Sequence, residues 1–231
     1  MATYNGEKYL RQQLESILPQ LSEEDELVIS DDHSTDSTDL IVKNLCDSRI
    51  IYLKNTLQAG VAHNFENALR HAHGDIVFLS DQDDVWLPAK IKEMTDFLLD
   101  KKLDIVTCDC SLTDENLNVT QPSYYANAHP LTKSAWGNLV KNLWLGSCMA
   151  FRREVIESAS PFPANIVAHD LWLALYGQLH YRCGYYPRVL QLYRRHPDTV
   201  SFAGSKSKNS FYFRVRYRLW VLWYLLTYKW L

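Results

Sequence analysis

Apolar positions follow two different patterns along the first half of the chain. Residues 7–18 place Leu10, Leu14 and Ile17 on one face of a helix, since these positions recur every three or four residues. Residues 27–30 instead form a short apolar run that ends in polar side chains, as a buried strand does. This contrast repeats down to residue 110 and sets the expected order of elements.

Helices and strands are predicted to alternate over residues 1–110. In order, they are helix 7–18, strand 27–30, helix 36–46, strand 49–53, helix 61–72, strand 76–79, helix 88–99 and strand 104–108. Asn5 is expected to cap the first helix, Ser34 or Asp36 the second, and Pro88 to open the fourth. The alternation predicts an α/β fold with a mostly parallel sheet flanked by helices.

Acidic residues follow two of these strands. Asp31 and Asp32 come after the first, and Asp81-Gln82-Asp83-Asp84 comes after strand 76–79. Ligands of such sheets bind beyond the carboxyl ends of the strands, so both clusters are expected in one crevice. Asp81 and Asp83 share a face of an extended chain, and oxygen ligands favour Mg²⁺ or Mn²⁺. We therefore expect a cation there that serves a nucleotide diphosphate.

Other chemistries fit parts of this pattern. Asp32 can accept hydrogen bonds from a pyrimidine N3–H or a ribose hydroxyl, or it can simply end a solvated turn before a helix. An EF-hand loop is excluded, because Trp86 stands where that loop needs glycine. Residues 81–85 also match the D-x-D-x-[TV] string of haloacid dehalogenase phosphatases, but at a later strand than usual. No G-x-G-x-x-G or Walker loop is present.

Four residues of the second half could take part in the same site. Asp170 stands at the start of an apolar helix, where the helix dipole favours a carboxylate, so it can be a general base or a plain cap. His196 can be a metal ligand or an ordinary surface histidine. Arg194 and Arg195 can neutralise a diphosphate or face solvent. The sequence alone leaves these choices open.

Composition places the protein among globular domains. Its 231 residues, 47% of them hydrophobic, suit one domain with an appendage: a nucleotide-binding half at 1–110, an acceptor-binding and catalytic half at 111–205, and a tail at 206–231. Five cysteines without a C-x-x-C pair indicate reduced thiols in the cytoplasm. No signal peptide is visible in the sequence.

The tail differs from the rest of the chain. No acid follows Asp198, whereas residues 211–231 hold nine aromatic residues with bases between them. Such a helix is typical of a membrane interface, and the apolar part at 219–228 is too short to span a bilayer. The alternative is a helix packed on the domain or on a second subunit of a homo-oligomer. The acidic main body argues against a nucleic acid partner.

Five segments in this order resemble the family 2 glycosyltransferases, inverting enzymes with a GT-A fold. The segments are residues 2–6, 29–36, 78–84, 169–170 and 193–196. The resemblance implies a nucleotide-sugar donor and a glycan acceptor. His169-Asp170 followed by Leu-Trp-Leu-Ala is similar to the rhamnosyltransferase-type members, which favours dTDP-rhamnose over a UDP-sugar as donor.

The resemblance also assigns roles to individual residues. The assignments are Asp170 as catalytic base; Ala2, Thr3, Tyr4, Asp32, Asn64 and Asp81 for the nucleotide; Asp81, Asp83 and His196 for the metal; Gly146, Ser147, Cys148 and Trp172 for the sugar or acceptor pocket; and Arg194 and Arg195 for the diphosphate. Two departures stand out: only Met1 precedes Ala2 where members have a strand, and His169 replaces the usual Glu. A lipid-linked acceptor at the cytoplasmic face of a bacterial membrane would fit the tail.

Overall fold

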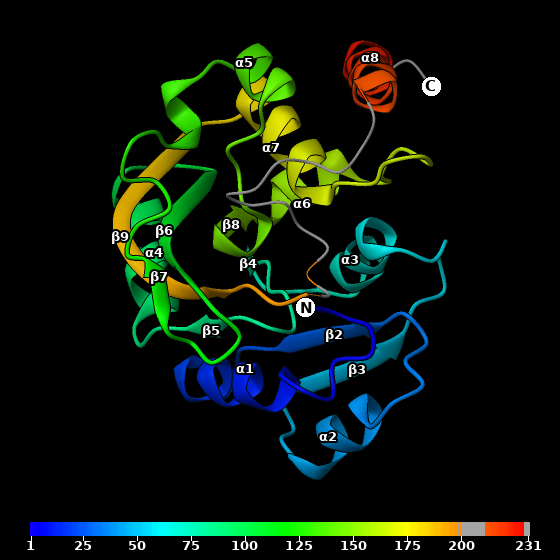
Figure 1. Ribbon diagram of the computed structural model, residues 1–231, viewed down its shortest axis with the longest axis vertical. Helices are drawn as coiled ribbons and strands as arrows, with labels where there is room; N and C mark the ends of the chain where they lie inside the picture. The colour runs from blue at the N-terminus through cyan, green and yellow to red at the C-terminus, as the bar shows by residue number, and fades with distance from the viewer. Residues whose placement is uncertain (198, 200–210, 229–231) are drawn as a thin grey trace.

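The computed structural model describes residues 1–197, 199 and 211–228 of the chain (Figure 1). Its α-helices are α1 (Leu10–Ile17), α2 (Thr38–Asn44), α3 (Val61–Arg70), α4 (Lys90–Asp100), α5 (Ala135–Val140), α6 (Arg153–Ala159), α7 (His169–His180) and α8 (Phe211–Thr227). Its strands are β1 (Ala2–Thr3), β2 (Leu27–Asp31), β3 (Ile50–Lys54), β4 (Ile76–Phe78), β5 (Val85–Trp86), β6 (Ile105–Thr113), β7 (Val119–Gln121), β8 (Met149–Arg152) and β9 (Cys183–Arg194). Short 3₁₀ turns are η1 (Leu18–Gln20), η2 (Pro130–Thr132) and η3 (Gly146–Cys148).

The first half follows the predicted alternation closely. Strands β1, β2 and β3 form a parallel sheet, with α3 on one side and α2 on the other (Figure 1). Leu10 and Leu14 on the apolar face of α1 are fully buried and share a core with Ile29 of β2. Burying apolar side chains of that size stabilises the fold by about 1.5–3 kcal/mol each.

A second, mixed sheet carries the rest of the fold. Its order is β4-β8-β6-β9-β5, and β7 pairs with β6. Strand β9 runs parallel to β6, whereas β8 is antiparallel to both β4 and β6, between which it lies. The Ala2 N–H donates to the Ser80 carbonyl at 3.4 Å, which joins the first sheet to the end of β4. The loops after β2 and β4 are thereby brought near each other.

The predicted helix caps are displaced. Asn5 adopts a φ of +46° and accepts a hydrogen bond from the Thr35 N–H at 2.9 Å, so it ties two loops together, and α1 starts only at Leu10. Pro88 lies before α4, which begins after Ala89, a residue with a φ of +69°. The helices were placed correctly, and α3 starts at Val61 as predicted, but α1, α2 and α4 start two or three residues later than predicted.

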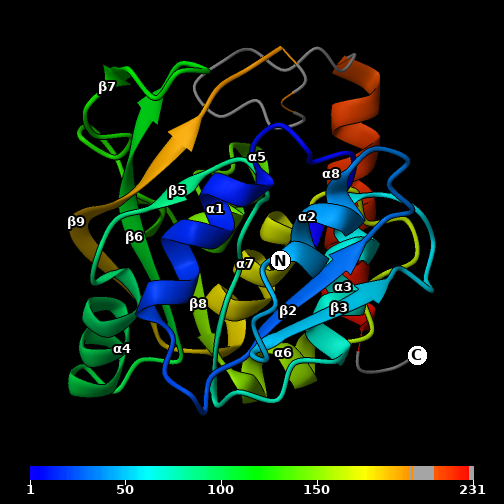
Figure 2. The same cartoon turned by 90° about the horizontal axis from the view of Figure 1, so that it is seen from below.

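Helix α8 lies against α5 and the segment just before α7, at the side of the molecule away from β2 (Figures 1 and 2). Val221 is fully buried, and the Tyr228 hydroxyl donates to the Pro161 carbonyl at 2.7 Å. The Arg218 Nε donates to the Leu139 carbonyl at 2.8 Å. No helix among the described residues is both long enough and apolar enough to cross a membrane.

Candidate active site

The loop after β4 holds two of the three residues predicted for the metal, Asp81 and Asp83. Burial, and then the charges of Asp83 and Asp170, raise the pKa of the Asp81 carboxyl to about 7. The Asp83 Oδ2 lies 2.8 Å from His196 Nε2, although 113 residues separate them. The ring of His196 also contacts that of Tyr9, with 4.8 Å between the ring centroids. The structure thus brings Asp83 and His196 together and places Asp81 within the electrostatic reach of Asp83.

The buried side chain of Asp84 anchors the same loop to the interior of the protein. It accepts hydrogen bonds from Gln191 Nε2 at 2.6 Å and from the Arg194 N–H at 3.1 Å. Lys90, fully buried, donates from Nζ to the Ser147 carbonyl at 2.8 Å and to Gln191 Oε1. Burial and neighbouring carboxylates raise the pKa of Asp84 well above its usual range. This network ties the acidic loop to β9 and η3.

The guanidinium group of Arg194 holds the acidic loop in place by hydrogen bonds. Its nitrogens donate to the carbonyls of Asp83 at 2.7 Å and Glu115 at 2.6 Å and to the Gln12 side chain, and the group lies over the Tyr9 ring. With 4% of the residue exposed, this arrangement favours a positioning role over the predicted contact with a diphosphate. Arg195 is partly exposed and donates its N–H to Thr113, so its diphosphate role stays a prediction.

The end of β1 connects the proposed nucleotide residues. The Gln82 side chain holds the backbone of Tyr4 on both sides, accepting from its N–H at 2.9 Å and donating to its carbonyl at 3.0 Å. Asn64 Nδ2 donates to the Thr3 carbonyl at 3.0 Å, while Asn64 Oδ1 is buried without a hydrogen-bond partner among the described residues. Ala2 pairs with β2 through its backbone. Tyr4 projects outward, 58% exposed.

The two aspartates after β2 do different work. Asp31 is fully buried; burial alone would raise its pKa, but hydrogen bonds from Lys54, Tyr52 and Ser34 outweigh it and lower the pKa. Asp32 accepts from Asn55 Nδ2 at 2.8 Å and from the Gly60 N–H at 2.7 Å. Asp32 therefore fixes the turn before α3, and its contact with a nucleotide base stays a prediction.

Asp170 begins α7 in a setting that suits a base. Burial raises the pKa of its carboxyl to about 6, against a hydrogen bond from the Leu171 N–H at 2.7 Å and a longer one from Asn142 Nδ2 at 3.4 Å. A carboxyl with that pKa is ionised at neutral pH yet more basic than an ordinary aspartate. The charge of Asp170 also reaches Asp81, so the base and the metal loop share one electrostatic environment.

His169 and Gly146 form the wall beside the base. The His169 ring stacks on Phe65 with centroids 3.9 Å apart, and burial lowers its pKa to about 3, so the ring is neutral. A Cβ on Gly146 would lie 2.6 Å from His169 Nε2 and 3.2 Å from the Asp170 Cβ. Gly146 thus lets the chain pass directly against the base.

The other predicted pocket residues lie deeper. Ser147 and Cys148 are buried, and Ser147 Oγ accepts from Gln191 Nε2 at 2.7 Å. Trp172 has no exposed surface and donates its indole N–H to the Ala159 carbonyl at 2.9 Å. The sequence predicted that Trp172 lines the sugar or acceptor pocket. This prediction was wrong, because Trp172 is a core residue behind the site.

The comparison with known sequences decides the family. The sequence profile of Glycosyl transferase family 2 matches residues 1–159, more than half of the chain and the part that contains both acidic loops and Gly146. The chain belongs to this family. Membership replaces the phosphatase interpretation of residues 81–85.

Two curated relatives extend the family match. The *Escherichia coli* protein UDP-Glc:alpha-D-GlcNAc-diphosphoundecaprenol beta-1,3-glucosyltransferase WfgD is 26% identical over 176 residues, 76% of this chain and 67% of the relative. The dTDP-rhamnosyl transferase RfbG of *Shigella flexneri* is 27% identical over 219 residues, 86% of this chain and 72% of the relative. Across the first four curated relatives, the match spans 41 to 72% of the relative's length.

A solved structure of the same fold confirms the GT-A architecture. The mannosyltransferase PcManGT of *Pyrobaculum calidifontis*, in complex with GDP-Man and Mn²⁺, is 22% identical, with a TM-score of 0.62 over 97% of this chain and 68% of that chain. At this identity the likeness carries the fold alone.

The family 2 site fits a divalent cation by its chemistry. Among residues 1–197, 199 and 211–228, no three His, Cys, Asp or Glu side chains are already close enough together to hold a metal. The Asp83–His196 contact nevertheless supplies an oxygen and a nitrogen donor. Burial and then the charges of Asp83 and Asp170 raise the pKa of Asp81, and a bound cation would favour its ionised form.

Sequence reasoning missed the residues that position the others. Gln82, Lys90, Asn142 and Gln191 all hold a predicted site residue or its loop in place. Gln82 could have been singled out because it lies inside the acidic run. The other three carry no local signal, since their partners are distant in the sequence.

Proposed function

We propose that this chain is an inverting glycosyltransferase that moves a sugar from a nucleotide diphosphate to a hydroxyl of a lipid-linked glycan. The observation that carries the proposal is the pairing of two carboxylate sites: Asp81 and Asp83 after β4, and Asp170 with a pKa of about 6 within electrostatic reach of Asp81. The first suits a leaving diphosphate, and the second suits removal of a proton.

The chemistry assigned to these residues is one displacement. Asp170 takes the proton of the acceptor hydroxyl, whose oxygen bonds to the anomeric carbon as the bond from that carbon to the diphosphate oxygen breaks. Attack from the face opposite the leaving group inverts the configuration. A bound Mg²⁺ or Mn²⁺, held by Asp83 and His196 with Asp81, would supply positive charge to the diphosphate. Asp32, Asn64 and the end of β1 would hold the nucleoside.

The named relatives support candidates for the donor and the acceptor. RfbG supports a dTDP-rhamnose donor, and WfgD supports a UDP-sugar donor and a GlcNAc diphosphate lipid acceptor. Thermal unfolding with UDP-, GDP- and dTDP-sugars and Mn²⁺ tests donor choice, because a ligand that binds the folded state raises Tm. A rise in Tm with one class of nucleotide-sugar, followed by transfer of its sugar to GlcNAc diphosphate lipid, supports the proposal. A rise in Tm without sugar transfer or donor hydrolysis would instead indicate a non-catalytic binding protein.

Helix α8 supports a peripheral position on a membrane. One face packs on the domain, while the opposite face exposes an apolar stripe at helical spacing: Tyr212, Val215, Leu219, Trp223 and Leu226. Bases without acids surround this stripe in the sequence, which suits an anionic lipid surface. A lipid-linked acceptor would then meet the enzyme where the lipid is anchored.

A further inference from the structure

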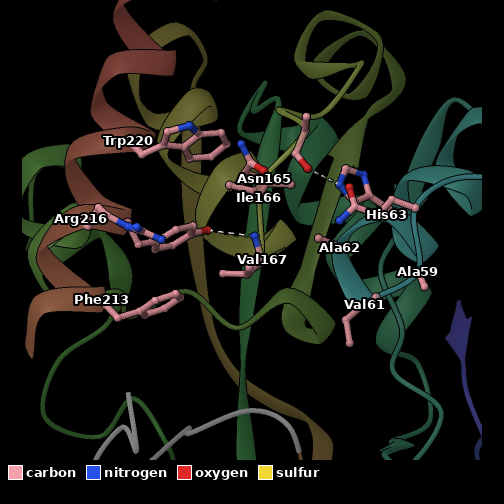
Figure 3. Close-up of a pocket in the computed structure, with 14 residues that line it drawn as sticks. Ala59, Val61, Ala62, His63, Asn165, Ile166, Val167, Phe213, Arg216 and Trp220 are labelled. Carbon is pink, nitrogen blue, oxygen red and sulfur yellow. Dashed lines mark hydrogen bonds between the residues drawn. The ribbon is translucent and has the colours of Figure 1, made fainter. Parts of the chain in front are cut away.

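A cavity of about 760 Å³ lies beside the carboxylate site rather than in it. Its walls are the first turn of α3 with the residues before it, the segment 164–167, and the first half of α8 (Figure 3). The volume is within the usual range of small-molecule sites, about 300–1,000 Å³. Neither Asp81, Asp83, Asp170 nor His196 lines it, so the catalytic assignment leaves this cavity unexplained.

One wall is a row of aromatic rings on α8. Phe213, Tyr217 and Trp220 recur at helical spacing and face the cavity together (Figure 3). Phe213 and Tyr217 are 3° from parallel with centroids 6.1 Å apart, and Tyr217 and Trp220 are 19° from parallel at 6.3 Å. Such a row offers flat apolar surface, against which the C–H face of a pyranose ring can pack.

The rest of the lining combines small apolar side chains with three polar ones, Gln58, His63 and Asn165. Ala62 and His63 lie across the cavity from the aromatic row, and Asn165 lies beside Ile166 (Figure 3). His63 Nε2 lies 3.1 Å from the Ala164 carbonyl, which ties α3 to the segment 164–167. The amides of Gln58 and Asn165 can meet the hydroxyls of a ligand whose apolar face lies on the aromatic row, and Arg216 adds positive charge to the lining.

The cavity is connected to the proposed base through the backbone. The Tyr217 hydroxyl accepts hydrogen bonds from the N–H groups of Val167 and Ala168, both at 3.3 Å. Ala168 is followed directly by His169 and Asp170 at the start of α7. A ligand on the aromatic row would therefore lie against the segment that carries the base.

We infer that this cavity binds a pyranose unit of the glycan acceptor, with the sugar ring on Tyr217 and Trp220. The inference rests on the proposed function, since it names where that enzyme holds its acceptor. Arg216 suits the diphosphate of such an acceptor. Helix α8 then has two roles: its inner face holds the glycan, and its outer stripe meets the lipid surface.

The test is binding of α-GlcNAc diphosphate carrying a short alkyl chain, measured by titration calorimetry with UDP and Mn²⁺ present. Trp220→Ala removes part of the aromatic row, and Val61→Trp fills the cavity from the opposite wall, where Val61 is 40% exposed. Trp223→Ala is the matched control, because Trp223 is on the outer face of the same helix and 50% exposed. The two cavity variants should weaken binding about tenfold or more, and the control should not.

Equal affinity of wild type, Trp220→Ala and Val61→Trp would overturn the inference, as would absence of binding to the wild type. The acceptor KM and donor hydrolysis separate this failure from failure of the proposed function. If the wild type transfers sugar and the cavity variants keep its acceptor KM, the enzyme assignment stands and the cavity assignment falls. If the acceptor KM rises in both cavity variants while donor hydrolysis is unchanged, the enzyme assignment and the cavity assignment both stand.

Discussion

Asp170 shows how a single residue acquires its chemistry from its surroundings. An ordinary aspartate has a pKa near 4, and a proton acceptor that weak takes a hydroxyl proton poorly. Burial raises the pKa of Asp170 to about 6, while the Leu171 N–H limits the rise. Gly146 lets the chain pass directly against Asp170, where any side chain would clash with His169. The environment, rather than the residue type, makes this position suit a base.

The raised pKa predicts a pH profile for transfer. Asp170 must be ionised to accept a proton, so the rate should fall by about tenfold per pH unit below about pH 6 and level off above it. The measurement is kcat as a function of pH at saturating donor, acceptor and Mn²⁺. Donor binding measured over the same range is the control. A rate that stays constant down to about pH 4.5, roughly one and a half units below the pKa, would contradict the assignment.

At the scale of elements, the acidic loop depends on a buried network. Lys90 of α4 joins Ser147 of η3 to Gln191 of β9, and Gln191 in turn donates to Asp84. The network spans three elements that are far apart in the sequence. Its members are charged or polar side chains in the core. Removing the hydrogen-bond partner of any one of them therefore lowers the stability of the fold.

Lys90→Met should therefore destabilise the fold, whereas Lys92→Met should not. The first change leaves two buried acceptors without a donor, at a cost of about 2–3 kcal/mol, or a Tm lowered by about 5–10 °C. Lys92 is on the same helix, but its side chain is 77% exposed and its partner Asp96 is on the surface. Calorimetric melting of both variants is the measurement. Equal Tm values for the two would show that the network contributes little.

The difference between the two halves explains what the sequence could predict. In the first half, periodicity alone placed α1, β2 and α3 within a few residues, because each buries one regular face. Strand β8 and the return of β9 beside β6 were not predictable, since their partners are distant and β8 inserts between β4 and β6.

The same limit applies to the site. Strand ends predicted the acidic loops, and the motif pattern predicted Asp170 and His196 as candidates. The pocket role that the family resemblance gave to Trp172 was wrong, because in α7 this side chain turns into the core. Contacts such as Asn142 with Asp170 depend on tertiary packing that no local pattern encodes.

At the scale of the whole molecule, α8 presents apolar side chains on two faces. The inner face is covered by the domain, with Val221 fully buried, while Leu219 and Trp223 remain 60% and 50% exposed on the outer face. Exposed apolar side chains in a row beside bases are typical of a surface that meets lipid headgroups. The domain would then be held with its acceptor cavity near the membrane.

This arrangement predicts binding to anionic vesicles. The protein should sediment with vesicles that contain phosphatidylglycerol, less so with phosphatidylcholine alone, and the double variant Leu219→Glu/Trp223→Glu should stay in solution. Leu40→Glu is the control, since Leu40 is 58% exposed on α2, on another part of the molecule. If the double variant and the control sediment equally with the vesicles, the outer stripe of α8 does not bind the membrane.

The central claim is that Asp170 performs the proton transfer at a site where the acidic loop holds the donor. The most direct measurement compares wild type with Asp170→Asn in sugar transfer and in donor binding with Mn²⁺. The account predicts a loss of kcat of about a hundredfold or more, with donor affinity within about twofold of the wild type and no loss of Tm at neutral pH. Turnover close to that of the wild type in Asp170→Asn would contradict it.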